Sequence, residues 1–456
     1  MGVCAPRARA SRRKAARAPF LIGDPMRSSL SAILLRLRRF ARQLWVRSVL
    51  IGALALVAAG ASRLVYPVVP SSMGGIVGAE AVDHLLQIIA DSMLAVTIFS
   101  LTIVVSIHRS TSSQWSPRAH RLIVSDDATM TVLSTFVGTW IFSLAAIVLR
   151  EAGLIDGNGL VVLFGLTLLV LALIVASLIR WIARLEDLGS LAQVGGRLEQ
   201  EARDAMQRRM ALPCLGGRPL LDASVAPVAA HPVRAAQTGW VMSVDAEGLH
   251  RLASEHEVEL RIEVPIGRFA YEGETLASIH PPRPDLEPDV QRGFEIGQLR
   301  TYEQDPRFGM VVLGEVACKA LSSGINDPGT AIEIVGRAAR VLWLWRDEAM
   351  AAGDPPYPRL QVAPLDPRDL VEDVFVPIAR DGRDKAEVQI HLQQALGSLA
   401  RHPDPTMARA ARDAAEGAWR VAQEALDETD LARVAHAAGR ASAASALRNE
   451  PARREA

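Results

Sequence analysis

One acidic residue lies in a segment that is otherwise apolar enough to cross a membrane. Asp91 falls within the segment 85–107, and a carboxylate in hydrocarbon costs free energy unless water, a cation or a positively charged partner meets it. Arg63, near the end of the preceding apolar segment, is the candidate partner. Asp91 is therefore expected either to pair with Arg63 and stabilise the fold, or to line a path for an ion or a solute.

A short polar motif follows the same segment. Pro117 disfavours helical backbone at Ser116, so the chain is expected to turn there. Arg118 and Arg121 then face the acidic carboxyl-terminal half of the chain, an attraction that salt screens. Our hypothesis is that Ser116, Pro117 and Arg118 couple the carboxyl-terminal half to the membrane segments.

A third candidate site lies where helical periodicity is interrupted, at residues 322–331. The simplest interpretation is that Asp327 caps a new helix and Pro328 occupies its first position. The alternative is that Asn326, Asp327 and Thr330 mark a helix start whose free amide groups bind an anion.

Motifs of common enzyme classes are missing from the sequence. It contains no GxGxxG, GxxxxGK[ST], HExxH or GxSxG pattern, and none of the 10 histidines forms an i, i+4 pair. The three cysteines, Cys4, Cys214 and Cys318, are isolated, which argues for reducing surroundings and against a zinc site. We therefore expect no catalytic residue, no cofactor and no metal site.

The elements that must position these residues fall into two halves of opposite charge. Residues 1–182 carry 18 Lys and Arg against 8 Asp and Glu, whereas residues 183–456 carry 32 against 42. Two uncharged runs, 128–149 and 157–179, are long enough for a helix to cross a hydrocarbon core of about 30 Å. The first half is therefore predicted to enter a membrane. The acidic second half argues against nucleic-acid binding.

We predict a membrane domain over 28–182 that follows a disordered basic extension, 1–27. Its four transmembrane helices are expected at about 48–66, 85–107, 130–149 and 160–182. Residues 28–47 are expected to form a basic amphipathic helix or to extend the first span. Twelve Lys and Arg residues precede the first span, the segment 67–84 has none and the loop 108–128 has three. The positive-inside rule therefore places both termini in the cytoplasm of a bacterial inner membrane.

The second half is predicted to be a cytosolic α+β domain. We expect a connecting helix and linker at 183–236, a small β module at 237–281, a helical region at 282–448 and a disordered tail at 449–456. Within these, strands are predicted at 239–244 and 258–264, and helices at 247–256, 290–299, 308–322 and 332–345.

The hairpin predicted at 266–279 needs Gly267 and Gly273 at its turns. Its glycine spacing resembles the barrel-sandwich modules that carry biotin or lipoate. No lysine lies in 237–281, so the module has no attachment point for such a cofactor.

Two motifs resemble the signature of a bacterial family of predicted membrane proteins, catalogued as domain of unknown function 2254. They are SQWSPR at 113–118, followed by FVGT at 136–139, and ALSSGINDPGTA at 320–331, with Ser323 where the family pattern has proline. The similarity extends over about 28–437. It implies a plasma-membrane protein with a cytosolic domain, and it implies no substrate, reaction or catalytic residue.

Two functional hypotheses follow from the sequence. One is a channel or transporter that the acidic cytosolic domain regulates; the other is a membrane-anchored sensor or assembly scaffold that transports nothing. The Ser, Thr and Gly residues of the second and third spans suit a pore, but they also suit close helix packing. The expected partners are the lipid bilayer and further copies of the chain in a homo-oligomer.

Overall fold

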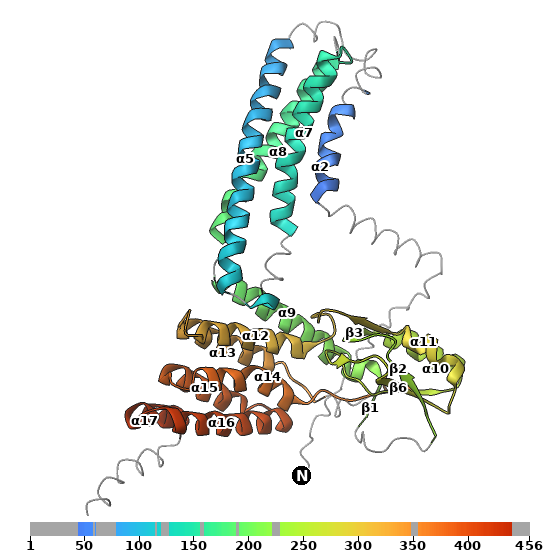
Figure 1. Cartoon of the computed structure of the whole chain (residues 1–456), viewed down its shortest axis with the longest axis vertical. Helices are drawn as coiled ribbons and strands as arrows, with labels where there is room; N and C mark the ends of the chain where they lie inside the picture. The colour runs from blue at the N-terminus through green and yellow to red at the C-terminus, as the bar shows by residue number, and fades with distance from the viewer. Residues whose placement is uncertain are drawn as a thin grey trace, which may run out of the picture. The chain divides into compact units, whose positions relative to one another are not determined.

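The computed structural model describes residues 44–57, 60, 79–114, 116–119, 127–155, 159–187, 191–220, 229–347 and 354–439. The chain divides into two units (Figure 1). The first holds α2 (Leu44–Gly52), α7 (Asp127–Glu151), most of α5 (Ala79–Gln114) and most of α8 (Gly159–Asp187). The second holds the rest. Both α5 and α8 begin in the first unit and end in the second.

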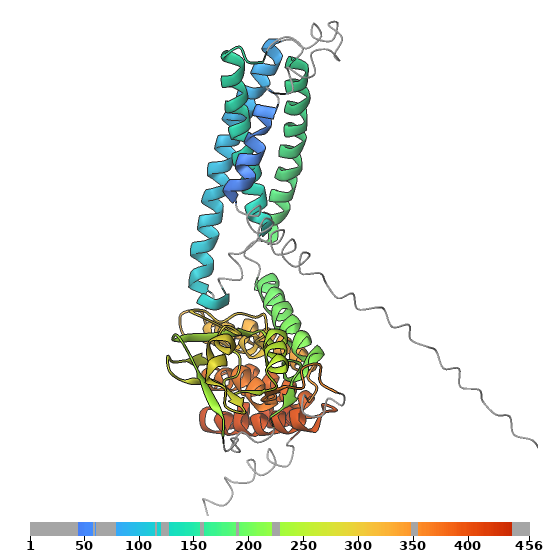
Figure 2. The ribbon, with the colours of Figure 1, turned by 90° about the vertical axis from the view of Figure 1, so that its right-hand side faces the viewer.

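Three helices among the described residues are long and apolar enough to cross a membrane. They cover Glu80–Ile107, Thr129–Glu151 and Gly159–Leu185, and they run alongside one another (Figure 1, Figure 2). A shorter apolar helix covers Trp45–Val57. Residues 58, 59 and 61–66 of the first predicted span, including Arg63, lie outside the described residues, as does 28–43 of the predicted amphipathic helix.

Small residues bring α2 and α7 together. A Cβ atom added at Gly52 would lie 2.5 Å from Cγ2 of Ile141, and one added at Gly138 would lie 2.7 Å from Cβ of Ile51. The hydroxyl of Ser48 also donates to a backbone carbonyl of α7, that of Ser134, at 3.1 Å. These residues of the third predicted span therefore serve close helix packing, as small residues do in membranes.

An ion pair joins α5 to α7. The guanidinium of Arg150 contacts both carboxylate oxygens of Asp83, and both side chains are partly buried. Arg150 ends one of the uncharged runs, so its charge is neutralised where the apolar part of α7 stops.

The second unit contains two sheets. The five-stranded sheet has the order β1 (Arg218–Pro219), β8 (Leu360–Val362), β4 (Glu259–Ile262), β6 (Thr275–His280) and β2 (His231–Arg234). Strands β1, β8 and β4 are parallel, and the remaining pairs are antiparallel. The antiparallel three-stranded sheet has the order β5 (Phe269–Ala270), β3 (Gly239–Val244) and β7 (Phe294–Gly297). Helices α10 (Ala246–Glu255) and α11 (Glu287–Gln291) accompany these sheets.

Two strands lie in the region predicted to be helical. The helix expected at 290–299 is wrong, because the chain instead forms α11 and β7 there, with Phe294 and Ile296 paired to Val244 and Val241 of β3. Strand β8 completes the five-stranded sheet from far along the chain. Both strands form because they pair with the edges of strands that are distant in sequence. The barrel-sandwich interpretation of 237–281 stays a prediction.

Helices build the rest of the second unit. Their main core lies among α9, α12, α13, α14, α15 and α16. Figure 1 shows them in stacked layers: α12 with α13, α14 with α15, and α16 with α17. Their bounds are α9 Leu191–Ala211, α12 Pro306–Leu321, α13 Pro328–Leu342, α14 Pro367–Asp381, α15 Ala386–Leu399, α16 Pro405–Ala425 and α17 Glu428–Ala437.

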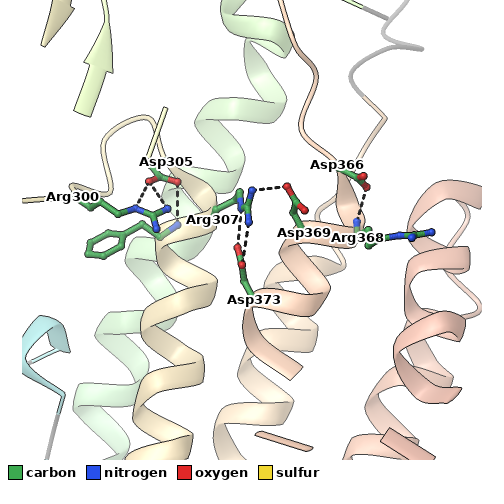
Figure 3. A network of polar contacts seen from close by, with 8 residues as sticks. Arg300, Asp305, Arg307, Asp366, Arg368, Asp369 and Asp373 are labelled. Carbon is green, nitrogen blue, oxygen red and sulfur yellow. Dashed lines mark hydrogen bonds and ion pairs between the residues drawn. The ribbon is translucent and has the colours of Figure 1, made fainter. Parts of the chain in front are cut away.

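A buried ion pair joins the sheets to the helices (Figure 3). The carboxylate of Asp305, only 3% exposed, caps α12 by accepting the N–H of Phe308 and also accepts from Arg300 Nε at 2.9 Å and Nη2 at 2.7 Å. The Arg300 guanidinium lies 5.3 Å from the ring centroid of Trp240 in β3 and 5.1 Å from that of Phe308. Burial raises the pKa of Asp305, and the charge of Arg300 opposes that rise.

The turn at Gly267 lies against this pair. Gly267 and Gly273, at the predicted turns of the hairpin, have φ values of +82° and +84°. A Cβ atom added at Gly267 would lie 2.1 Å from Oδ2 of Asp305, whereas one added at Gly273 would have no atom within 4 Å. The two glycines therefore share a backbone conformation and differ only in their surroundings.

This difference gives a matched pair of variants. Gly273→Ala should lower the free energy of unfolding by about 1–2 kcal/mol, which is the cost of a left-handed backbone. Gly267→Ala should cost about 3 kcal/mol or more, because the methyl group also displaces a partner of a buried ion pair. Thermal unfolding of both full-length variants in detergent measures the difference. Equal losses would show that Gly267 does not press on Asp305.

The packing of α2 on α7 gives a second pair. Gly138→Leu should separate the two helices and cost about 1–3 kcal/mol, as overpacking does. Gly165 of α8 is exposed and has no atom within 4 Å of an added Cβ, so Gly165→Leu should stay within about 0.5 kcal/mol of the native protein. Melting temperatures in detergent compare the two. A tolerated Gly138→Leu would contradict the close approach.

Candidate functional site

The exposed face of α5 carries polar residues at helical spacing. They follow one another at intervals of four, three and four residues, and two smaller or apolar residues continue the same line by four and three. We call this line the α5 stripe, and it consists of the exposed residues Glu80, His84, Gln87, Asp91, Ala95 and Ile98. The stripe is visible in the sequence as a near-heptad pattern, although sequence reasoning singled out only Asp91.

Asp91 lies deep in its helix. Because α5 begins at Ala79 rather than at the predicted residue 85, Asp91 is about 18 Å from the start of the helix at 1.5 Å per residue. The carboxylate is exposed and has no hydrogen bond or ion pair within the part of the chain that the structure describes. The structure therefore does not bring Asp91 together with a described cation, and Arg63 lies outside the described residues.

The exposed side of α8 has a different chemistry. Between residues 168 and 179 its large exposed side chains are aliphatic: Leu168, Leu169, Leu171, Leu173, Val175 and Ile179. Hydrocarbon accepts such a surface without cost. It does not accept a carboxylate, so Asp91 requires other surroundings than the apolar side chains that α8 and also α5 expose.

The segment after α5 is fixed to α12, within the second unit. The hydroxyl of Ser116 is buried and accepts the N–H of Ala119 at 3.2 Å, while Pro117 begins a short helical segment, 117–119. Ala119 is fully buried in the main helical core. Arg118 donates to the carboxylate of Glu315 on α12, with 39% and 27% of the two side chains exposed. Ser116, Pro117 and Arg118 thus form one docked segment.

A second attachment holds α9, the helix that follows α8. The carboxylate of Glu199 accepts from Arg337 Nη1 at 2.8 Å and from Arg340 Nε and Nη2, both at 2.8 Å. The hydrogen bonds from Arg340 and Arg337 lower the pKa of Glu199 despite its partial burial. This triad fixes α9 to α13. Sequence reasoning missed it, because Glu199 and the arginines are far apart in the chain.

The turn between α12 and α13 contains the third candidate group. Asp327 accepts the N–H of Thr330 at 3.1 Å and its hydroxyl at 2.6 Å, and Asn326 has a φ of +50°. The hydrogen bonds from Thr330 lower the pKa of Asp327. Its carboxylate thus occupies the place that an external anion would take at this helix start.

A cavity of about 230 Å³ lies between the sheet and the helices of the second unit. Ile262, Val264, Val362 and Leu365 contribute apolar walls, and Arg209, Asp305, Arg307, Asp366 and Asp369 contribute charge. Figure 3 shows Arg307 between two carboxylates. It contacts Asp369 and bonds Asp373 through Nε at 2.8 Å and Nη2 at 3.1 Å. These carboxylates therefore hold α14 to α12 through Arg307.

Metal and thiol chemistry find little support in the described part of the chain. No cluster of three or more His, Cys, Asp or Glu side chains there is placed to hold a metal ion. Burial raises the pKa of Cys318 to about 12, so its thiol stays protonated at neutral pH, and Cys214 is buried.

The chain is similar in sequence to known bacterial proteins and to one protein family. The chain is 28% identical over 235 residues to uncharacterized proteins of Mycobacterium bovis and Mycobacterium tuberculosis. The match spans 47% of this chain and 44% of each relative, which is less than half of their length. No solved structure matches the chain. The model of the family described as "Predicted membrane protein (DUF2254)" matches residues 41–398, and the chain therefore belongs to that family.

Proposed function

We propose that this membrane protein conducts cations across the bilayer along the α5 stripe, and that its α+β domain regulates the path. One observation carries the proposal: Asp91 lies within a helix that is long and apolar enough to cross a membrane, about 18 Å from the helix start, and has no partner among the described residues. A charge in hydrocarbon needs water or a cation beside it. Rings of carboxylates are a usual way for a pore to favour cations.

We also propose a topology. The first predicted span, 48–66, is taken as a fourth crossing beside the three membrane-length helices, so that both termini lie on one side of the membrane. The twelve basic residues before α2 and the three in the loop 108–128 support a cytoplasmic location for that side in a bacterial inner membrane. The second unit is then cytosolic.

Regulation follows from the two attachments. The chain leaves α5 and docks on α12 through residues 116–119, and it leaves α8 and docks on α13 through Glu199. A ligand or a partner that moves α12 or α13 would therefore pull on both membrane helices through covalent continuity.

The first test removes the charge of Asp91 from the proposed path. In proteoliposomes, Asp91→Asn should reduce cation flux about tenfold, equivalent to about 1.4 kcal/mol of lost ion stabilisation, without lowering the melting temperature. Asp83→Asn is the control on the same helix. It breaks the pair with Arg150 and should lower the melting temperature. Absence of cation flux from the native protein would refute conduction and favour the sensor or scaffold.

The second test separates regulation from stability. Glu315→Arg places two guanidiniums side by side and should change cation flux, while the loss of this partly exposed pair should cost only about 1 kcal/mol of stability. The exchange Arg118→Glu with Glu315→Arg should restore the native flux. Asp413→Arg, beside Arg368 at 3.2 Å, makes the same charge change elsewhere and should leave flux unaltered. An effect of similar size from Asp413→Arg would indicate a general charge effect.

A further inference from the structure

We propose that the α5 stripe is covered by the α5 stripe of a second copy of this chain, so that the cation path is completed only in a homo-oligomer. This inference rests on the proposed function and names the partner at the same site. Within the described residues of the first unit, the chain leaves the whole stripe exposed.

Lipid is the wrong occupant for the polar positions of this face. The same unit presents Leu, Val and Ile of α8 to hydrocarbon, and α5 exposes Ile88, Leu94 and Phe99 beside the stripe. The stripe instead presents Glu80, His84, Gln87 and Asp91 over its first three turns. Polar groups in a bilayer are favourable only where they meet protein or water.

A second copy fits the pattern of the stripe. All copies insert in the same orientation, so their α5 helices are parallel and each residue meets its counterpart near a common axis. The spacing of four, three, four, four and three residues keeps one seam facing a partner helix along the span.

The chemistry of individual positions suits self-association. The amide of Gln87 both donates and accepts, so it can bond to its own counterpart, and Ala95 allows close backbone approach. His84 lies one turn from Glu80 and can meet the carboxylate of the neighbouring copy. Carboxylates repel one another at the axis: those of Glu80 have His84 of the neighbouring copy within reach, and a cation or water between the Asp91 carboxylates offsets the repulsion there. The cation that the interface needs between the Asp91 carboxylates is therefore the ion that the path conducts.

Cysteine cross-linking in native membranes tests this arrangement. The background variant has Cys4, Cys214 and Cys318 replaced by alanine and must retain the native melting temperature. Gln87→Cys and Ala95→Cys place thiols on the stripe. Ser92→Cys is the matched control, because Ser92 is also exposed but points about 100° away from Asp91. Oxidation should yield cross-linked dimers several-fold more abundantly at the two stripe positions than at position 92.

Two results would overturn the proposal. Equal cross-linking at position 92 and at the stripe would indicate random collision. A cross-link within one chain between Arg63→Cys and Asp91→Cys, without dimers at the stripe, would identify the remainder of the first span as the occupant.

The outcome is independent of transport. Dimers at the stripe without cation flux would support the interface and refute the proposed function. Flux without dimers would refute the interface and place the path inside a single chain.

Discussion

Hydrocarbon neither solvates a charge nor accepts a hydrogen bond, and this constraint governs the arrangement of the first unit. It explains why the hydroxyls of Thr135, Thr139 and Ser143 bond to carbonyls one turn earlier in α7. It also explains why Arg150 pairs with Asp83 where the apolar run ends. Asp91, like Glu80 at the start of α5, has no partner among the described residues, and it lies within the apolar part of the helix, so a functional interpretation begins there.

In the second unit water is available to polar groups. Specific hydrogen bonds and ion pairs, rather than a continuous apolar surface, organise its helices. Helices α12, α13, α14 and α16 each begin with an Asp-Pro pair in which the carboxylate caps the helix and proline occupies the first turn. At α12 the cap has a second task. Asp305 also binds Arg300, which stacks on Trp240 of the three-stranded sheet, so one carboxylate starts a helix and attaches the sheet to it.

Local signals in the sequence predicted much of this architecture. The uncharged runs predicted α7 and α8, the glycine spacing predicted turns at Gly267 and Gly273, where φ is positive, and Asp327-Pro328 predicted the start of α13. The elements and ion pairs that the sequence did not predict involve residues that are distant in the chain. Strand β7 pairs with β3, and β8 enters a sheet about a hundred residues after β4, so no local periodicity indicates them. The ion pairs formed by Arg300, Glu199 and Arg150 could not be predicted for a related reason. The sequence gives the charge of each residue, but it does not show which charged residues lie close together in the fold.

The motif at 320–331 has a structural role as the link between α12 and α13, and this role differs from the anion binding considered for it. Helix α12 holds the segment that follows α5, and α13 holds the helix that follows α8, so the turn between α12 and α13 is the short covalent link between the two attachments. Asp327 caps α13 while its own N–H bonds to the carbonyl of Ala320 at 2.8 Å, and the backbone N–H of Asn326 bonds to that of Ser322. These bonds fix the angle between the two helices. A rigid turn at this position would make α12 and α13 move together, which is what the proposed regulation of α5 and α8 requires.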